Sequence, residues 1–289
     1  MAGSRLTPDE AMRKHWPEYL MEAWGLGTFM VSAGLVTTLL EYPNSPVHHA
    51  IADPDLRRAL IGVAMGLTAI AIIYSPWGKQ CGAHINPAVT LTFLRLGKIR
   101  AIDAAFYIAA QFLGGALGVA LVWVILGSAF ADPPVDFVNT RPGVAGLIVA
   151  YLVEVAMALG LMLMVLTALA SMRLMRFIGL FAGLMVATYI AVLGPFSGMS
   201  INPARSFASA LPSQYWENLW LYFTAPVIGM QLAVSIFRLA ELGHERFCAK
   251  LIHDDAYRCI HCGHEPAKQS VESGSLIETA RPQGQTGRS

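Results

Sequence analysis

The sequence predicts an all-α membrane protein, and three observations carry that prediction. Hydrophobic residues make up 55% of the 289 positions and charged residues only 13%, which is too apolar for an ordinary soluble domain. Six apolar stretches come close to or exceed the roughly 20 residues needed to cross about 30 Å of hydrocarbon. These stretches lack the two-residue alternation of membrane strands, and backbone groups in lipid must be satisfied internally, so we expect helices.

The expected spans are, in order, 19–40, 56–75, 102–128, 144–171, 177–193 and 219–239. Several charged residues precede the first apolar run, so we expect it to remain as a membrane helix and not to be cleaved. Lys and Arg collect in cytoplasmic loops, and most of the 20 basic residues fall on that side if the N-terminus is inside. We therefore expect a multi-pass cell-membrane protein, with residues 1–18 and 241–289 as cytoplasmic segments flanking a membrane domain over 19–240.

The two halves of this domain repeat each other. The first and fourth spans both begin Tyr-Leu-x-Glu, which places Glu22 and Glu154 at corresponding positions. The second and fifth spans each carry Gly-x-x-x-Gly, which lets backbones approach closely in lipid and which we assign to helix packing. Three spans per half is an odd number, so the repeats, about 19–128 and 144–240, must insert with opposite orientation. An inverted 3+3 repeat places its functional site near the bilayer midplane.

Ile-Asn-Pro-Ala occurs once in each half and begins a short apolar segment, over 86–96 and 202–211. As a helix each segment is about 15 Å long, half a bilayer, so we expect two re-entrant half-helices. Asparagine is a preferred N-cap, and proline suits the first helical position. The two boxes consist of Asn86, Pro87, Ala88, Asn202, Pro203 and Ala204. In an inverted repeat the two helix starts meet at the midplane, and each capping asparagine keeps an NH2 group to donate into the space between.

Two amide donors and two positive helix ends can bind the oxygen of a small neutral molecule while repelling cations and protons. The boxes therefore predict a pore for uncharged, hydrogen-bonding solutes. Arg205 follows the second box inside a membrane segment. The helix dipole disfavours a cation in the first turn, and a charge inside a membrane is costly, so a residue kept there is expected to have a functional role. The alternative for Arg205 is a salt bridge to an acid of an outer loop.

With Gly-Ala-His before the first box and Arg-Ser after the second, the chain resembles the aquaporin and glycerol-facilitator family of major intrinsic proteins from Tyr19 to Leu239. The resemblance implies a right-handed helical bundle and a homotetramer with one pore per subunit. It also implies passive conduction of water and of small uncharged solutes such as glycerol, urea, ammonia or metalloid acids. The partners expected are these solutes and the lipid bilayer, with no nucleic acid.

The resemblance further implies an outer selectivity filter. Its members here are Met65, Ile190, Met199 and Arg205. An ungapped count gives Gly66 in place of Met65, but we prefer Met65 because the inner turn SPWGKQ is one residue longer than usual. Water channels of the family usually carry an aromatic residue and a histidine at the first two positions, so this apolar ring predicts a wider and less polar aperture.

Glu22 and Glu154 are intramembrane acids, so a proton-coupled carrier that uses them is the alternative function. The resemblance implies instead that they accept hydrogen bonds from the backbone leading to the half-helices. His84 lies two residues before the first asparagine, and this position favours a residue that holds the entrance loop or lines the inner mouth over a proton relay or a metal ligand. A junction-forming relative with little flux is a third possibility. No nucleophile, base and orienting group cluster along the chain, so we expect no enzyme.

After residue 240 the sequence turns polar. Cys259 and Cys262 form Cys-x-x-Cys followed by His264, with Cys248 and His253 upstream, which resembles half of a zinc-binding knuckle. Zinc on this tail is the one cofactor that the sequence raises, and a plain reduced tail is the alternative because the cytoplasm disfavours disulfides. The polar composition from residue 265 onward predicts disorder.

Overall fold

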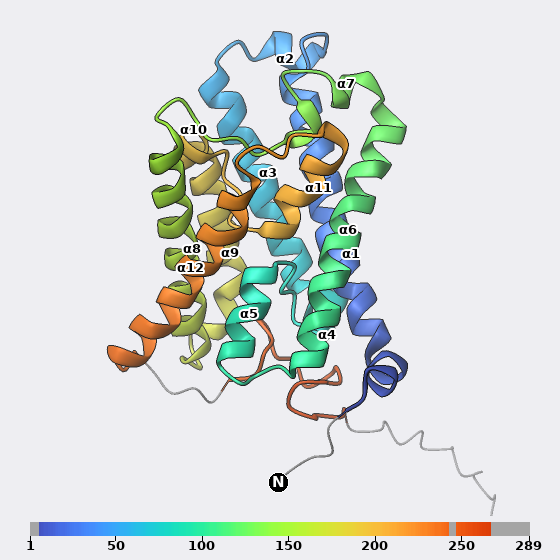
Figure 1. The fold of residues 1–289 in the computed structure, drawn as a ribbon, viewed down its shortest axis with the longest axis vertical. Helices are drawn as coiled ribbons and strands as arrows, with labels where there is room; N and C mark the ends of the chain where they lie inside the picture. Colours follow the sequence, from blue (N-terminus) through green and yellow to red (C-terminus); the bar gives the residue numbers. More distant parts are fainter. Residues whose placement is uncertain (1–5, 243–246, 267–289) are drawn as a thin grey trace, which may run out of the picture.

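The computed structural model describes residues 6–242 and 247–266, and this part consists of helices and loops without a strand. Six helical segments within it are long and apolar enough to cross a membrane. They are α1 (Pro8–Glu41), α3 (Pro54–Tyr74), α6 (Ala101–Leu126), α8 (Leu147–Leu169), the interrupted segment Met175–Ser197 and α12 (Leu219–Leu239). Figure 1 shows them as an upright bundle. The expected all-α membrane fold with six spans is confirmed.

The first helix starts well before the expected boundary at residue 19. Thr7 caps it, because its side chain accepts the Glu10 backbone N–H at 3.3 Å while the Glu10 carboxylate accepts the Thr7 N–H at 3.0 Å. Further along the extension, His15 Nδ1 lies 2.7 Å from Asp103 Oδ1 of α6. The cap and this contact make residues 8–18 helical and hold them against the bundle, so the helix begins before the apolar stretch that starts at residue 19.

The fifth span is not one uniform helix. It runs through the 3-10 turn η2 (Met175–Phe177), α9 (Ile178–Thr188), the π-helical turn η3 (Tyr189–Leu193) and α10 (Gly194–Ser197). The expected end at residue 193 therefore falls at the end of the π-helical turn, and the helix continues for another turn beyond it. Single π turns widen a helix locally and often occur at functional sites.

The two half-helices are α5 (Pro87–Arg95) and α11 (Pro203–Ser213), and α11 extends two residues beyond the expected end at 211. Helix α5 packs on α12 of the second half and α11 on α6 of the first half. Each half-helix therefore lies against the opposite repeat, with α11 above α5 in Figure 1. The four remaining short elements, in loops, are α2 (Pro46–Ala50), α4 (Pro76–Cys81), α7 (Ser128–Ala131) and η1 (Asp136–Val138).

Glycines determine how closely the halves approach. Helices α3 and α9 pack across the interface between the halves. A Cβ added at Gly66 would lie 2.5 Å from the Gly183 carbonyl oxygen, and one added at Gly183 would lie 2.6 Å from the Gly66 carbonyl oxygen. Any side chain at either position would push the helices apart, which supports the packing interpretation of Gly-x-x-x-Gly.

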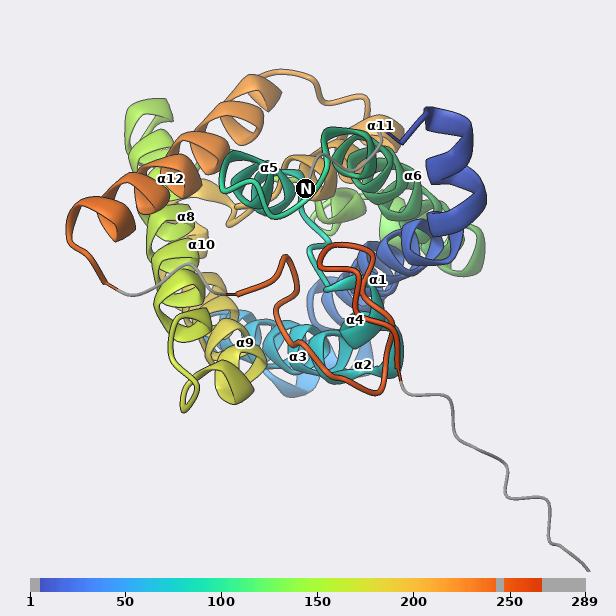
Figure 2. The same ribbon diagram turned by 90° about the horizontal axis from the view of Figure 1, so that it is seen from below.

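The tail segment 247–266 lies across the lower end of the bundle, next to α4, as Figure 2 shows from below. It contains turns and bends but no helix. We expected disorder from residue 265 onward, and the residues after 266 lie outside the part that the structure describes.

Candidate functional site

Two loops of unusual backbone conformation lead into the half-helices. Left-handed φ values occur at Ala83 (53°) and Ile85 (43°) before α5, and at Met199 (47°) and Ile201 (47°) before α11. Each loop begins with a left-handed glycine. Non-glycine residues in this region cost free energy and persist only where the surroundings hold them, so the matched pair of loops requires support.

Two buried glutamates supply that support. Glu22 accepts the backbone N–H groups of His84 at 2.8 Å and Ile85 at 2.7 Å. Glu154 does the same in the other half, with Ser200 at 2.8 Å and Ile201 at 2.6 Å. Bonds from backbone amides to a carboxylate are among the strong ones, so each acid fixes one loop.

Both glutamates lie away from the path that a solute would take. Each is fully buried, and neither lines the cavity that lies between the two halves. Glu22 also accepts the Gln111 side-chain amide at 2.8 Å, and Glu154 also accepts the Ser197 hydroxyl at 2.8 Å. Carboxylates with their acceptors engaged in this way give no support to the proton-coupled carrier.

The two box asparagines face each other across the repeat. The side-chain oxygens cap their own helices, with Asn86 accepting the Ala88 N–H at 2.9 Å and Asn202 the Ala204 N–H at 3.1 Å. The NH2 group of Asn86 donates to the Ile201 carbonyl at 2.8 Å, and that of Asn202 donates to the Ile85 carbonyl at 2.8 Å. We expected each NH2 group to be free, but one of its two N–H bonds is engaged in the opposite loop. The other N–H of each asparagine is left for a solute.

A cavity of about 330 Å³ runs between the two halves. Both asparagines line it, and so do all four residues expected in the filter: Met65, Ile190, Met199 and Arg205. Met65 comes from α3 and Ile190 from the π-helical turn, while Gly66 faces α9 and does not line the cavity. No carboxylate of the described residues lines it, so none of these residues brings a negative charge to the wall.

Arg205 is one of two arginines that line the cavity, and the other, Arg58, pairs with Asp55 at 2.7 Å. The backbone N–H of Arg205 donates to the Asn202 side chain at 3.3 Å, which fixes Arg205 in the first turn of α11. Its Nη1 is buried and has no hydrogen-bond partner among the described residues, and no ion pair to an outer-loop acid is formed there. A buried donor without a partner is costly, so this guanidinium has an N–H that a polar molecule in the cavity could accept.

His84 lies at the end of the cavity next to the tail, between the tail and the first half-helix. It is buried, and its Nδ1 lies 3.1 Å from the Thr90 hydroxyl and its Nε2 2.9 Å from the Ala249 carbonyl of the tail. The ring of His261, also from the tail, lies parallel to it at a centroid distance of 6.1 Å. Burial lowers the pKa of His261 well below its usual value, so this ring is neutral and does not repel its neighbour.

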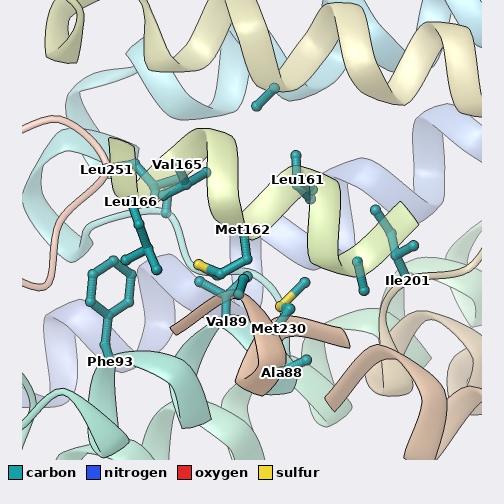
Figure 3. Packing of buried hydrophobic residues seen from close by; sticks show 14 of the residues in the cluster. Ala88, Val89, Phe93, Leu161, Met162, Val165, Leu166, Ile201, Met230 and Leu251 are labelled. Atoms are coloured by element: carbon teal, nitrogen blue, oxygen red, sulfur yellow. The ribbon is translucent and has the colours of Figure 1, made fainter. Parts of the chain in front are cut away.

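The tail also reaches the cavity, which the sequence did not predict. Leu251 is buried and lines the cavity together with Val165 of α8, and Figure 3 shows both in the buried apolar cluster. The sequence carried one indirect signal, the cysteines around this segment. Cys248, His253, Cys259 and Cys262 have ligand atoms that all lie within 4.8 Å of one another.

His264, which we expected among these ligands, is not in the group. Its Nε2 lies 3.0 Å from the Asp255 backbone carbonyl, and the group's histidine is His253. The sequence favoured His264 because it follows the Cys-x-x-Cys after a single glycine. The fold of the segment instead brings the upstream histidine back onto the two cysteines.

Two capped half-helices that meet head to head in an inverted bundle, around a cavity without acidic groups, define a passive membrane channel for small uncharged solutes. Residues 11–237 match the family described as major intrinsic protein, and the chain belongs to that family. It is a multi-pass membrane channel and not an enzyme, as the resemblance implied.

Curated relatives are similar over most of the membrane domain. Aquaporin TIP4-4 of Zea mays is 34% identical over 230 residues, which cover 74% of this chain and 88% of the relative. Aquaporin Z of Photorhabdus laumondii is 31% identical over 227 residues, covering 74% of this chain and 94% of the relative. The X-ray structure of the aquaglyceroporin from Plasmodium falciparum has the same fold, with a TM-score of 0.66, 19% identity, and coverage of 79% of this chain and 99% of that one.

Proposed function

We propose that this channel conducts water together with larger neutral solutes, glycerol among them, and that Asn86, Asn202 and Arg205 orient the solute. The observation that carries the proposal is one cavity whose largely apolar wall includes both asparagines and Arg205. A solute in this cavity exchanges its hydrogen bonds with water for hydrogen bonds to these few side-chain donors. Protons and cations meet a guanidinium and two helix N-termini, which repel them.

The proposed filter consists of Met65, Ile190, Met199 and Arg205. Three of these side chains are apolar, and two are the flexible, unbranched methionine, which adapts to solutes of different width. A ring with one fixed polar member and three apolar ones can receive the carbon face of a polyol while Arg205 binds its hydroxyls. These properties favour a broader solute range than water alone.

We also propose a homotetramer in the cell membrane, with both termini in the cytoplasm. Large apolar side chains are exposed along the outer faces of the spans, as at Leu67, Leu117 and Leu152, and must meet lipid or another subunit. The excess of Lys and Arg on the tail side of the bundle supports the orientation. Light scattering in detergent that gives one subunit per particle would contradict the tetramer.

Solute range is tested with reconstituted vesicles and stopped-flow light scattering. Met199→Phe places a rigid ring in the filter, so we expect glycerol permeability to fall much more than water permeability. Met172→Phe is the matched control, because that methionine is exposed in a loop and leaves both permeabilities unchanged. An unaltered ratio of glycerol to water permeability in Met199→Phe would contradict the filter assignment.

A further inference from the structure

Four potential metal ligands of the tail converge although they are spread over fifteen residues of sequence, from 248 to 262. Cys248 Sγ lies 3.2 Å from Cys259 Sγ, and His253 Nε2 lies 3.3 Å from Cys262 Sγ. In a tetrahedral zinc site with three sulfurs and one nitrogen, ligand atoms are separated by about 3.5–3.8 Å. The observed arrangement is therefore close to that of a closed structural site, because all four ligand atoms lie within 4.8 Å of one another.

The surroundings of the four ligands are also those of a metal site. His253 turns Nε2 towards the cysteines, while its Nδ1 lies 3.4 Å from Asp255 Oδ1. A carboxylate near the far ring nitrogen favours the tautomer that leaves Nε2 free to bind metal. The Cys-x-x-Cys turn is closed by the Gly263 N–H donating to the Cys259 carbonyl at 2.9 Å, with Gly263 at a left-handed φ of 77°. Such a turn directs both thiols of Cys259 and Cys262 to one point.

All four cysteines of the chain are free thiols. The Cys248–Cys259 separation of 3.2 Å is well beyond the roughly 2.05 Å of a disulfide. Three soft thiolates with one imidazole in tetrahedral geometry suit zinc better than the hard cations Mg²⁺ and Ca²⁺.

The segment that carries these ligands is bound to the channel at several points. The Leu251 N–H donates to the Gly82 carbonyl at 3.1 Å, directly before the first half-helix. Lys79 Nζ lies 3.0 Å from Asp254 Oδ2, and Arg258 donates to the buried Glu18 carboxylate at 2.8 and 2.7 Å. A Cβ on Gly82 would lie 2.8 Å from the Ala249 carbonyl, so the tail and the entrance loop are in close contact.

We propose that Cys248, His253, Cys259 and Cys262 bind one zinc ion, and that this ion holds the tail across the cytoplasmic mouth of the pore. A segment of this length has no core of its own, and a metal supplies the folding free energy that it lacks. Fixed in this way, the tail places the apolar Leu251 in the cavity wall beside His84. An apolar side chain at the entrance of a pore hinders water, so the zinc-bound tail restricts flux.

The metal is tested on the full-length protein, purified with a tag that lacks histidine and kept reduced. Mass spectrometry of the metal content is expected to give about one zinc per subunit for the wild type. His253→Ala and Cys262→Ser remove a ligand and lose most of the zinc. His264→Ala is the matched control, a histidine of the same segment outside the group, and keeps it.

Equal zinc in all four proteins, no zinc in the wild type, or a Cys248–Cys259 disulfide in its place would overturn the assignment. Zinc content is measured without reference to flux, so it tests the metal site whether or not the solute range proposed above is correct. The effect on the mouth is tested in vesicles, where chelation of wild-type zinc from the tail side should raise water permeability by about twofold or more. Added zinc should reverse the rise, and a permeability that chelation leaves unchanged or lowers would show that the tail does not restrict the pore.

Discussion

Removing the charge of Glu154 gives the sharpest test of how the second half-helix is held. The carboxylate accepts two backbone N–H groups, from Ser200 at 2.8 Å and Ile201 at 2.6 Å. In Glu154→Gln one oxygen is replaced by an NH2 group that faces an N–H, which leaves a buried donor unsatisfied at a cost of about 1–3 kcal/mol. The remaining bond loses its charge assistance, worth about 1 kcal/mol more. We therefore expect a destabilisation of about 2–4 kcal/mol.

The assay is thermal unfolding in detergent, followed by tryptophan fluorescence. At about 2–4 °C per kcal/mol for a chain of this size, Tm should fall by roughly 5–15 °C. Glu22→Gln should lower Tm by a similar amount, because Glu22 holds the first loop in the same way. Glu217→Gln, at an exposed acid, is the control and should leave Tm unchanged. A wild-type Tm in Glu154→Gln, together with loss of flux, would refute the supporting role and favour proton coupling.

Two further changes test the packing and the filter. Gly66→Val brings a side chain against the Gly183 carbonyl and should cost at least about 1–3 kcal/mol, read as a lower Tm; an unchanged Tm would contradict the close α3–α9 contact. Arg205→Val removes the positive charge of the filter, so vesicles loaded with a pH-sensitive dye should acidify faster under a proton gradient. Dye traces identical to those of the wild type would argue against charge exclusion at Arg205.

Most of the membrane fold followed from the sequence, because its signals are local. Span length, the paired boxes and the odd number of helices in each half are enough to place six helices and two half-helices in an inverted repeat. The capping role of Asn86 and Asn202 also follows from residue type alone. The choice between Met65 and Gly66 depended on a turn one residue longer than usual, and the cavity lining agrees with Met65.

Features that depend on distant contacts were missed. The π-helical turn that carries Ile190 has no sequence signature, and the donation from each asparagine to the opposite loop depends on how the halves meet. The polar first turns of α1 were not anticipated, because hydropathy marks only the apolar part of a helix. The place of Leu251 in the cavity depends on how the tail folds back. His264 is nearer than His253 to the Cys-x-x-Cys in sequence, but the fold brings His253 to the cysteines.

The central claim is that this chain forms a passive pore for neutral solutes. The most direct test is the rate at which reconstituted vesicles shrink in an osmotic jump, measured over a range of temperatures and against empty vesicles. A pore predicts faster shrinkage with a low activation energy and a rate that rises linearly with the osmotic difference. Shrinkage no faster than that of empty vesicles, or flux that saturates and follows an imposed pH gradient, would contradict it.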